Sequence, residues 1–318
     1  MKLANLIMAH KNPAQLERLV RAMEHEDFLF FIHLDPRCDM QEFAYLAELP
    51  GVYFTPRRFR MRWASYHFTH AIIECTRDVL ASGQEFDFLN LMSGQDYPIK
   101  PAQTIHDFFA QHPGYSFMAC EPEGSAWWKH AASRIEKYHT TYFSFRGQYA
   151  LQSLVNAVLP KRKFPLPYEL YGSSDGSWWT ITRDCAAYLV RFVDEHPGLR
   201  KFSIFTWGSD EFLLATILMN SPYKPLIINE NYRYIDWSEG GANPKLLTAA
   251  DFARLTHAHK LFARKLDLER DPALFDLLDE WLLRQEASRA LAALPRPTPP
   301  AAGPVLAASK ALAPRHTS

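Results

Sequence analysis

Apolar and polar positions alternate along the first hundred residues in blocks that predict strands followed by helices. The block that begins at Leu3 is a continuous apolar run ending in the turn His-Lys-Asn-Pro, and apolar residues then recur at helical spacing between Leu16 and Met23. The apolar run Phe28 to Leu34 predicts a second strand. Together these blocks predict a β-α-β unit, in which one helix connects two parallel strands.

The same alternation continues along the chain and sets the expected fold class. Helices are predicted at 39–49 and 64–81, and strands at 52–54 and 86–92. The run FLFFIHL lacks the period-two alternation of a half-exposed strand, which indicates burial on both faces. We therefore predict an α/β domain with a Rossmann-like, mostly parallel central sheet and helices on both faces.

Beyond residue 100 the pattern becomes looser. Helices are predicted at 105–111, 183–195 and 210–219, and strands at 177–182 and 226–229, while 127–149 is aromatic and basic and 160–167 reads as extended. A last helix at 272–294 completes one domain, which we expect to span residues 1–294. Residues 295–318 are rich in Pro and Ala without any aromatic residue, and this composition predicts a disordered tail.

Charge and cysteine content narrow the function classes. Lys and Arg total 35, as do Asp and Glu, so no overall field exists to attract nucleic acid or an anionic membrane. The four cysteines form no C-x-x-C pair, which argues against structural zinc or a disulfide framework and favours a reducing compartment. No run approaches the roughly 20 apolar residues of a membrane span, and the first segment is too short for a signal peptide.

The phosphate-binding motifs of the commonest nucleotide enzymes are absent. The sequence contains no G-x-x-x-x-G-K-[ST], no G-x-G-x-x-G after the first strand, and no Asp-x-Asp triplet that could hold a divalent cation against a diphosphate. A bound diphosphate would therefore have to be neutralised by basic side chains or helix N-termini.

Polar side chains follow two of the predicted strands. Asp35 in HLDPR and Asp96 in LMSGQDYPIK come just after apolar runs, at the sheet edge where open α/β folds bind ligands. Asp35 is a candidate contact to a base or ribose, and the loop containing Asp96 is a candidate sugar site. Both aspartates are also compatible with simple turn geometry.

A third polar cluster opens the predicted helix in TWGSDEFLLATIL. Ser209 is a candidate N-cap, and Asp210 and Glu211 fall in the first turn. Both carboxylates could merely complement the helix dipole, or Glu211 could be a general base. A basic set near the C-terminus could be a solvated helix face or could neutralise a diphosphate; it consists of Lys245, His257, His259, Lys260, Arg264 and Lys265.

At these segments the sequence resembles the core-2/I-branching β-1,6-N-acetylglucosaminyltransferase family, glycosyltransferase family 14, which includes peptide O-xylosyltransferases. The matching stretches occur in family order between about residues 3 and 280. They are LIMAHKNPAQLERLV, FIHLDPR, FLNLMSGQDYPIK, GSSDGSWWTITRDCAAYLV, TWGSDEFLLATIL, RYIDWSEGG and HKLFARKLD.

The resemblance implies a GT-A-like fold and an inverting, metal-independent transfer from a UDP-sugar, with N-acetylglucosamine and xylose as the leading donor sugars. It assigns the catalytic base to Glu211 and contacts with the donor diphosphate to Lys265 and Lys245. It further implies a uridine-side contact at Asp35 and an acceptor-side tryptophan at Trp237. No metal cofactor is expected.

Unlike animal members, the chain shows neither an N-terminal anchor nor a cysteine framework, so it resembles a bacterial-type member. We expect a cytoplasmic enzyme, with peripheral association at the inner membrane face left open, acting on a glycan, lipid-linked or other hydroxyl acceptor. Two alternatives come from other classes: an inactive carbohydrate-binding protein of the same fold, and a glycosidase. The glycosidase is disfavoured because adjacent helical residues such as Asp210 and Glu211 point about 100° apart.

Overall fold

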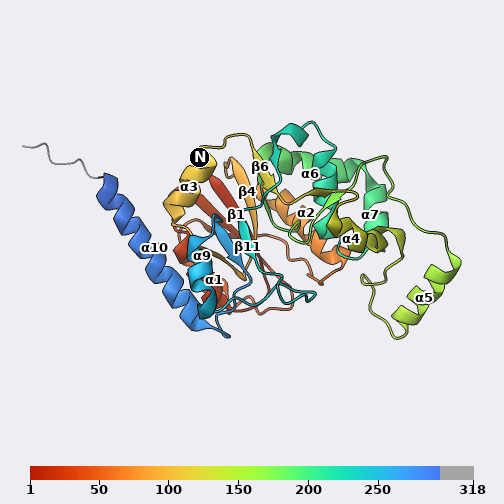
Figure 1. The fold of residues 1–318 in the computed structure, drawn as a ribbon, viewed down its shortest axis with the longest axis horizontal. Helices are drawn as coiled ribbons and strands as arrows, with labels where there is room; N and C mark the ends of the chain where they lie inside the picture. The colour runs from red at the N-terminus through yellow and green to blue at the C-terminus, as the bar shows by residue number, and fades with distance from the viewer. Residues whose placement is uncertain (294–318) are drawn as a thin grey trace, which may run out of the picture.

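A seven-stranded sheet forms the centre of the computed structural model, which describes residues 1–293 (Figure 1). Its strands, in spatial order, are β10 (Ile227–Ile228), β6 (Ser116–Met118), β9 (Trp179–Thr182), β4 (Phe88–Ser93), β1 (Leu3–Ala9), β2 (Phe28–Leu34) and β3 (Val52–Phe54). Within the described residues, only β9 runs antiparallel to its neighbours in this sheet. The predicted α/β class with a mostly parallel central sheet is confirmed.

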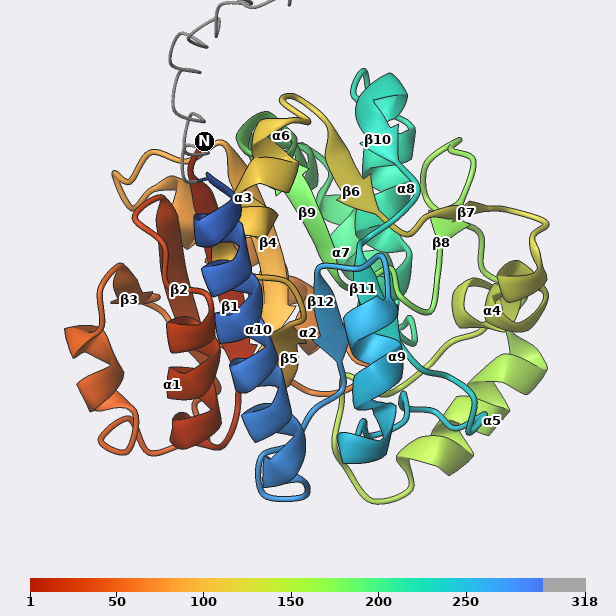
Figure 2. The ribbon, with the colours of Figure 1, turned by 60° about the vertical axis from the view of Figure 1, so that its left-hand side comes forward.

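Helices cover both faces of the sheet and divide the core into two clusters (Figure 2). One face packs against α1 (Pro13–Ala22), α3 (Ala102–Ala110) and α10 (Pro272–Ala293), and the other against α2 (Tyr66–Leu80), α6 (Arg183–Glu195) and α8 (Leu213–Met219). Along β1, Leu3 and Ile7 belong to the first cluster, whereas Ala4 and Leu6 belong to the second. Every residue of β1 is buried, which explains its uninterrupted apolar run.

Two smaller sheets and several short helices complete the fold. The strands β11 (Arg233–Ile235), β12 (Phe262–Arg264) and β5 (Asp96–Pro98) form one sheet, and β7 (Glu121–Pro122) and β8 (Tyr171–Gly172) form the other. The remaining helices are α4 (Ala126–Glu136), α5 (Gln148–Val158), α7 (Pro197–Ser203) and α9 (Phe252–His257), with 3₁₀ turns η1 (Ala44–Glu48), η2 (Ser209–Glu211), η3 (Lys224–Leu226) and η4 (Ala249–Asp251). In the first small sheet Asp96 stands opposite Arg264.

Capping side chains explain why two of the predicted helices begin where they do. The Thr182 hydroxyl accepts a hydrogen bond from the Cys185 amide at 3.3 Å, so α6 starts at the predicted residue 183. The Asn12 side chain accepts from the Gln15 amide at 3.0 Å, and Pro13 occupies the first helical position of α1.

Several predictions of local structure are wrong, and others fall on residues that the structure does not describe. The helix predicted at 39–49 is only the 3₁₀ turn η1. The helix predicted at 210–219 is divided at Phe212, whose φ of −140° is not helical, and Ser209 bonds the Thr69 hydroxyl at 2.7 Å instead of capping a helix. The last predicted residue of the 272–294 helix and the predicted tail at 295–318 lie outside the described residues.

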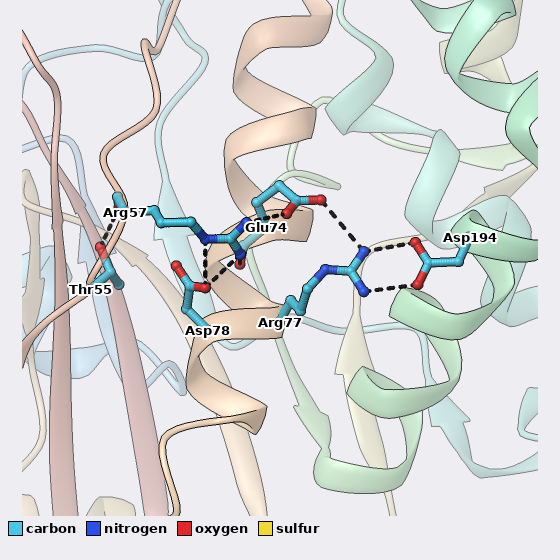
Figure 3. A network of polar contacts seen from close by, with 6 residues as sticks. All are labelled: Thr55, Arg57, Glu74, Arg77, Asp78 and Asp194. Atoms are coloured by element: carbon cyan, nitrogen blue, oxygen red, sulfur yellow. Dashed lines mark hydrogen bonds and ion pairs between the residues drawn. The ribbon is translucent and has the colours of Figure 1, made fainter.

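A polar network ties the segment after β3 to α2 and α6 (Figure 3). The Arg57 guanidinium bonds Asp78 at 2.5 Å and Glu74 at 2.9 Å on α2, and Arg77 of α2 pairs with Asp194 of α6 at 2.7 Å. Because these pairs are partly exposed, each contributes at most about 1 kcal/mol. Their main effect is geometric, since they fix the start of the segment that leads to residues 61–64.

No helix within residues 1–293 is both long enough and apolar enough to cross a bilayer.

Candidate active site

A cavity of about 540 Å³ opens at the carboxyl ends of β1, β2 and β4, beside the small β11-β12-β5 sheet. Ligands of open α/β folds bind at this edge. Its lining includes Met8, His10, Arg37, Met61, Arg62, Trp63, Ala64, Ser93, Gln95, Ser177, Trp178, Asp210, Glu211, Trp237, Arg264 and Lys265. Glu211, Lys265 and Trp237, three of the residues singled out in the sequence, therefore face one shared space.

The backbone around Glu211 is held by a close approach from the loop before β9. The Glu211 carbonyl accepts a hydrogen bond from the Ser173 amide at 3.0 Å. A Cβ atom at Gly176 would lie 2.5 Å from the same carbonyl oxygen, so this contact requires glycine. On the other side, Gly208 precedes η2 with a φ of +62°, a conformation that glycine adopts without strain. These constraints fix the turn that presents Glu211 to the cavity.

The protonation of Glu211 suits a general base. Burial raises its pKa to about 7, and the nearby Asp210 carboxyl adds to the rise, while Arg134 opposes it. A base whose pKa lies near neutrality can accept a proton and release it again at physiological pH. Burial also raises the pKa of Asp210, whose carboxylate accepts a hydrogen bond from the Ser177 hydroxyl at 2.5 Å.

Arg134 of α4 contacts the candidate base Glu211, and the sequence analysis did not single it out. Its guanidinium pairs with the Glu211 carboxylate and stacks on Trp207 at 4.2 Å and Trp127 at 5.1 Å, measured to the ring centroids. Arg134 and Glu211 are 77 positions apart, and the segment carrying Arg134 matched no family motif. Only the packing of α4 against η2 brings them together, so no local pattern could have revealed the pair.

Cationic side chains also line the cavity. Lys265 follows β12, and burial together with the nearby charges of Arg264 and Lys11 lowers its pKa. The Arg264 guanidinium stacks on Trp178 at 4.2 Å, and Arg37 also lines the space. Positive groups and a largely buried carboxylate in one cavity can divide the work of a transfer, because the cations stabilise an anionic leaving group while the carboxylate removes a proton.

Comparison with known proteins supplies the family. The sequence model of the Core-2/I-branching enzyme family matches residues 3–256. This chain belongs to the Core-2/I-branching enzyme family. The match includes Glu211 and its surroundings, while Lys265 lies beyond its last residue. This match confirms the family resemblance that was drawn from the sequence.

Curated relatives of this family member include two xylosyltransferases. Xylosyltransferase 2 of Rattus norvegicus is 24% identical over 302 residues, which cover 87% of this chain and 33% of that protein. Xylosyltransferase oxt of Drosophila melanogaster is 23% identical over 299 residues, covering 84% of this chain and 32% of that protein. The chain thus spans about a third of the length of these relatives.

Solved structures show a more distant likeness. Mouse xyloside xylosyltransferase 1 in its apo form gives a TM-score of 0.38 at 12% identity, covering 83% of this chain and 97% of that one. The galactosyltransferase LgtC, in complex with donor and acceptor sugar analogs, gives a TM-score of 0.38 at 10% identity, covering 92% and 98%.

The sequence analysis placed two aspartates, Asp35 and Asp96, in the site. In the structure both lie beneath the wall of the cavity. Asp35 is fully buried, and its carboxylate accepts from the Arg37 guanidinium at 2.8 Å and the Met61 amide at 2.8 Å. Burial opposes ionisation of Asp35, but these hydrogen bonds outweigh it and lower the pKa to about 2. Asp35 therefore presents Arg37 to the cavity, and a direct contact to uridine would require Arg37 to move.

Asp96 has the same kind of role. It is fully buried, and its carboxylate accepts from Arg264 at 2.7 Å and from the Ser93 amide at 3.0 Å. Asp96 is not among the residues that line the cavity, and its contact with an acceptor sugar stays a prediction. Asp96 holds Arg264 in place against Trp178.

Lys245 is the third predicted site residue that does not line the cavity. Its ammonium pairs with the buried carboxylate of Asp251 at 2.8 Å, and Arg254 contacts the same carboxylate. Residues 242–244 line the cavity, but Lys245 does not. Arg264, adjacent to Lys265, does line the cavity, and the pairing of β12 with β5 sets its position.

Trp237 does line the cavity, so its role as an acceptor contact stays a prediction. Its indole nitrogen donates to the Asp175 carboxylate at 2.7 Å, which holds the ring in one orientation. Burial raises the pKa of Asp175, and the hydrogen bond from Trp237 opposes the rise.

Potential metal ligands gather elsewhere. Within residues 1–293, three side chains that could hold an ion together are His25, Asp27 and His106, whose ligand atoms all lie within 4.8 Å of one another. His25 and Asp27 precede β2, at the sheet edge opposite the cavity. The independence of the reaction from metal ions stays a prediction.

The Glu211–Arg134 pair predicts a pH dependence. Glu211 must be deprotonated to act as a base, so kcat/KM is expected to fall as the pH drops through about 7. Because Arg134 lowers the pKa of Glu211, Arg134→Gln should move the midpoint to higher pH. The check is a pH profile of kcat/KM for both proteins. A loss of rate with an unmoved midpoint would show that Arg134 acts only in packing.

Proposed function

We propose that this protein transfers a sugar from a UDP-sugar to a hydroxyl acceptor, with inversion at the anomeric carbon and without a metal ion. The observation that carries the proposal is the shared cavity, whose lining includes Glu211 together with Lys265, Arg264 and Arg37. The absence of an Asp-x-Asp triplet supports the metal-free route, because something other than a chelated cation must neutralise the diphosphate.

In the proposed reaction the Glu211 carboxylate accepts the proton of the acceptor hydroxyl as its oxygen attacks the anomeric carbon. A new carbon–oxygen bond forms on the face opposite UDP, while the bond between the anomeric carbon and the β-phosphate oxygen breaks. The electron pair leaves with UDP, where Lys265 and Arg264 stabilise the developing charge. The proton held by Glu211 then passes to solvent and restores the base.

Xylose and N-acetylglucosamine remain the leading donor sugars. The curated relatives are xylosyltransferases, which favours xylose. The resemblance drawn from the sequence, to a family named for N-acetylglucosamine transfer, favours N-acetylglucosamine. Trp237, which lines the cavity with its ring held by Asp175, supplies a flat apolar face against which a sugar ring can stack. We propose a glycan, lipid-linked or other hydroxyl acceptor and a cytoplasmic location.

A donor panel tests the proposal. UDP-xylose, UDP-N-acetylglucosamine and other UDP-sugars are each incubated with the protein, and the release of UDP is measured. In a separate experiment, calorimetry measures the binding of UDP itself. We expect one donor to be turned over and UDP to bind. Binding of free glycans with no affinity for UDP would identify an inactive carbohydrate-binding protein. Release of free sugar from an oligosaccharide without nucleotide would identify a glycosidase.

A further inference from the structure

The helix α5 projects from the body of the molecule, away from the central sheet (Figure 1). Its amphipathic pattern is reversed relative to an ordinary surface helix. Gln148, Gln152 and Asn156 follow one another at intervals of four residues and hydrogen-bond the preceding loop. The polar stripe of α5 thus faces the protein.

The apolar side chains of α5 face solvent. Leu151, Leu154 and Val158 share one side of the helix, and 46%, 62% and 72% of their surfaces are exposed. Tyr149 is 64% exposed, and the loop before the helix adds Phe145 at 46%. Soluble surfaces rarely gather apolar residues in this way unless the surface has a partner.

The segment around α5 carries a strong positive bias in an otherwise neutral chain. Between residues 137 and 168 there are five Lys or Arg and no Asp or Glu. Lys161 pairs with Glu136, and Arg162 donates to backbone carbonyl groups. Within residues 1–293, Lys137, Arg146 and Lys163 form no ion pair with a carboxylate, so their charges remain available to an anionic partner.

We propose that α5 and its basic flanks bind the surface of an anionic lipid bilayer. An exposed apolar stripe beside uncompensated Lys and Arg matches the two components of such a surface, acyl chains and anionic headgroups. A second copy of the chain fits less well, because a two-fold contact would bring the same positive charges together. This inference goes beyond the proposed function and does not depend on it.

We call the exposed apolar residues of α5 and the basic residues that flank them the docking surface. This surface continues to the mouth of the cavity. Arg62, which lines the cavity, donates to the Phe143 carbonyl at 2.7 Å, at the start of the loop that leads to α5. Its neighbour Trp63 also lines the cavity and is 59% exposed. A bilayer bound at α5 would therefore lie next to the Arg62–Trp63 wall of the cavity.

Vesicle co-sedimentation of the full chain tests the proposal without any nucleotide, so the result is independent of catalysis. The chain is mixed with phosphatidylcholine vesicles that contain or lack phosphatidylglycerol. We expect binding to the anionic vesicles only. Binding should weaken several-fold when salt is raised from about 0.1 M to about 1 M, because the Debye length falls from about 10 Å to about 3 Å.

Variants locate the binding surface. The triple variant Leu151→Gln, Leu154→Gln and Val158→Gln keeps good helix-forming residues at exposed positions and should lower vesicle binding at least about tenfold. Leu154→Gln and Leu283→Gln form a matched pair, because Leu283 of α10 is 66% exposed and lies outside the docking surface. Only the α5 variant should weaken binding.

Two results would overturn the proposal. One is binding of the triple variant to anionic vesicles at the wild-type level. The other is no vesicle binding together with self-association in analytical ultracentrifugation that the triple variant abolishes, which would make the α5 surface a contact between copies.

Discussion

Glu211→Gln is expected to lower turnover by about 10²–10⁴-fold while UDP binding persists. The substitution keeps the shape of the side chain but removes the group that accepts the acceptor's proton. It also removes a buried carboxylate whose ionisation is disfavoured, so the fold should be retained. The measurement is kcat at saturating donor, with UDP affinity by calorimetry and thermal unfolding as a check on folding.

The matched control is Glu48→Gln, since Glu48 is an exposed glutamate on η1, away from the cavity. Its turnover should equal that of the wild type. Near-normal turnover by a folded Glu211→Gln protein would show that another group is the base, and Asp210, which lines the same cavity, would be the next candidate.

Lys265→Ala is expected to lower kcat/KM by about 10²–10³-fold, the usual effect of removing one group that stabilises developing negative charge. Lys265 lines the cavity, whereas the ammonium of Lys245 is paired with Asp251 outside it. Lys245→Ala is therefore the matched control, and its effect should be less than about tenfold. The comparison requires only kcat/KM for the donor in the three proteins.

The sequence resemblance assigned both lysines to the donor diphosphate, whereas in the structure only Lys265 lines the cavity. The two variants therefore distinguish between these assignments. Equal losses in the two variants would mean that Lys245 leaves Asp251 and reaches the donor when it binds. A negligible loss in Lys265→Ala would remove the main cation from the proposed mechanism.

Much of the fold could be predicted because its signals are local. The uninterrupted apolar runs of β1 and β2 indicated strands buried on both faces, and Thr182 and Asn12 mark the starts of α6 and α1 through their own hydrogen bonds. The division of the predicted 210–219 helix at Phe212 could not be predicted in this way. That break depends on Gly176 and Ser173, which contact Glu211 from a distant segment.

The candidate site was predictable in its principal residues but not in their partners. Glu211, Lys265 and Trp237 belong to segments with recognisable patterns, and all three line the cavity. Asp35 and Asp96 follow strands as expected, but sequence alone cannot tell a carboxylate that faces a cavity from one that holds an arginine there. Both aspartates hold an arginine, so that Arg37 and Arg264 are the groups that line the cavity.

The central claim is that cationic side chains in the cavity that contains Glu211 do the work of a metal ion. UDP release from the active donor, measured with the wild-type protein in excess EDTA and again with added Mn²⁺, tests this most directly. We expect the same rate in both conditions. Loss of activity in EDTA that Mn²⁺ restores would contradict the claim, because the cavity would then depend on a bound ion.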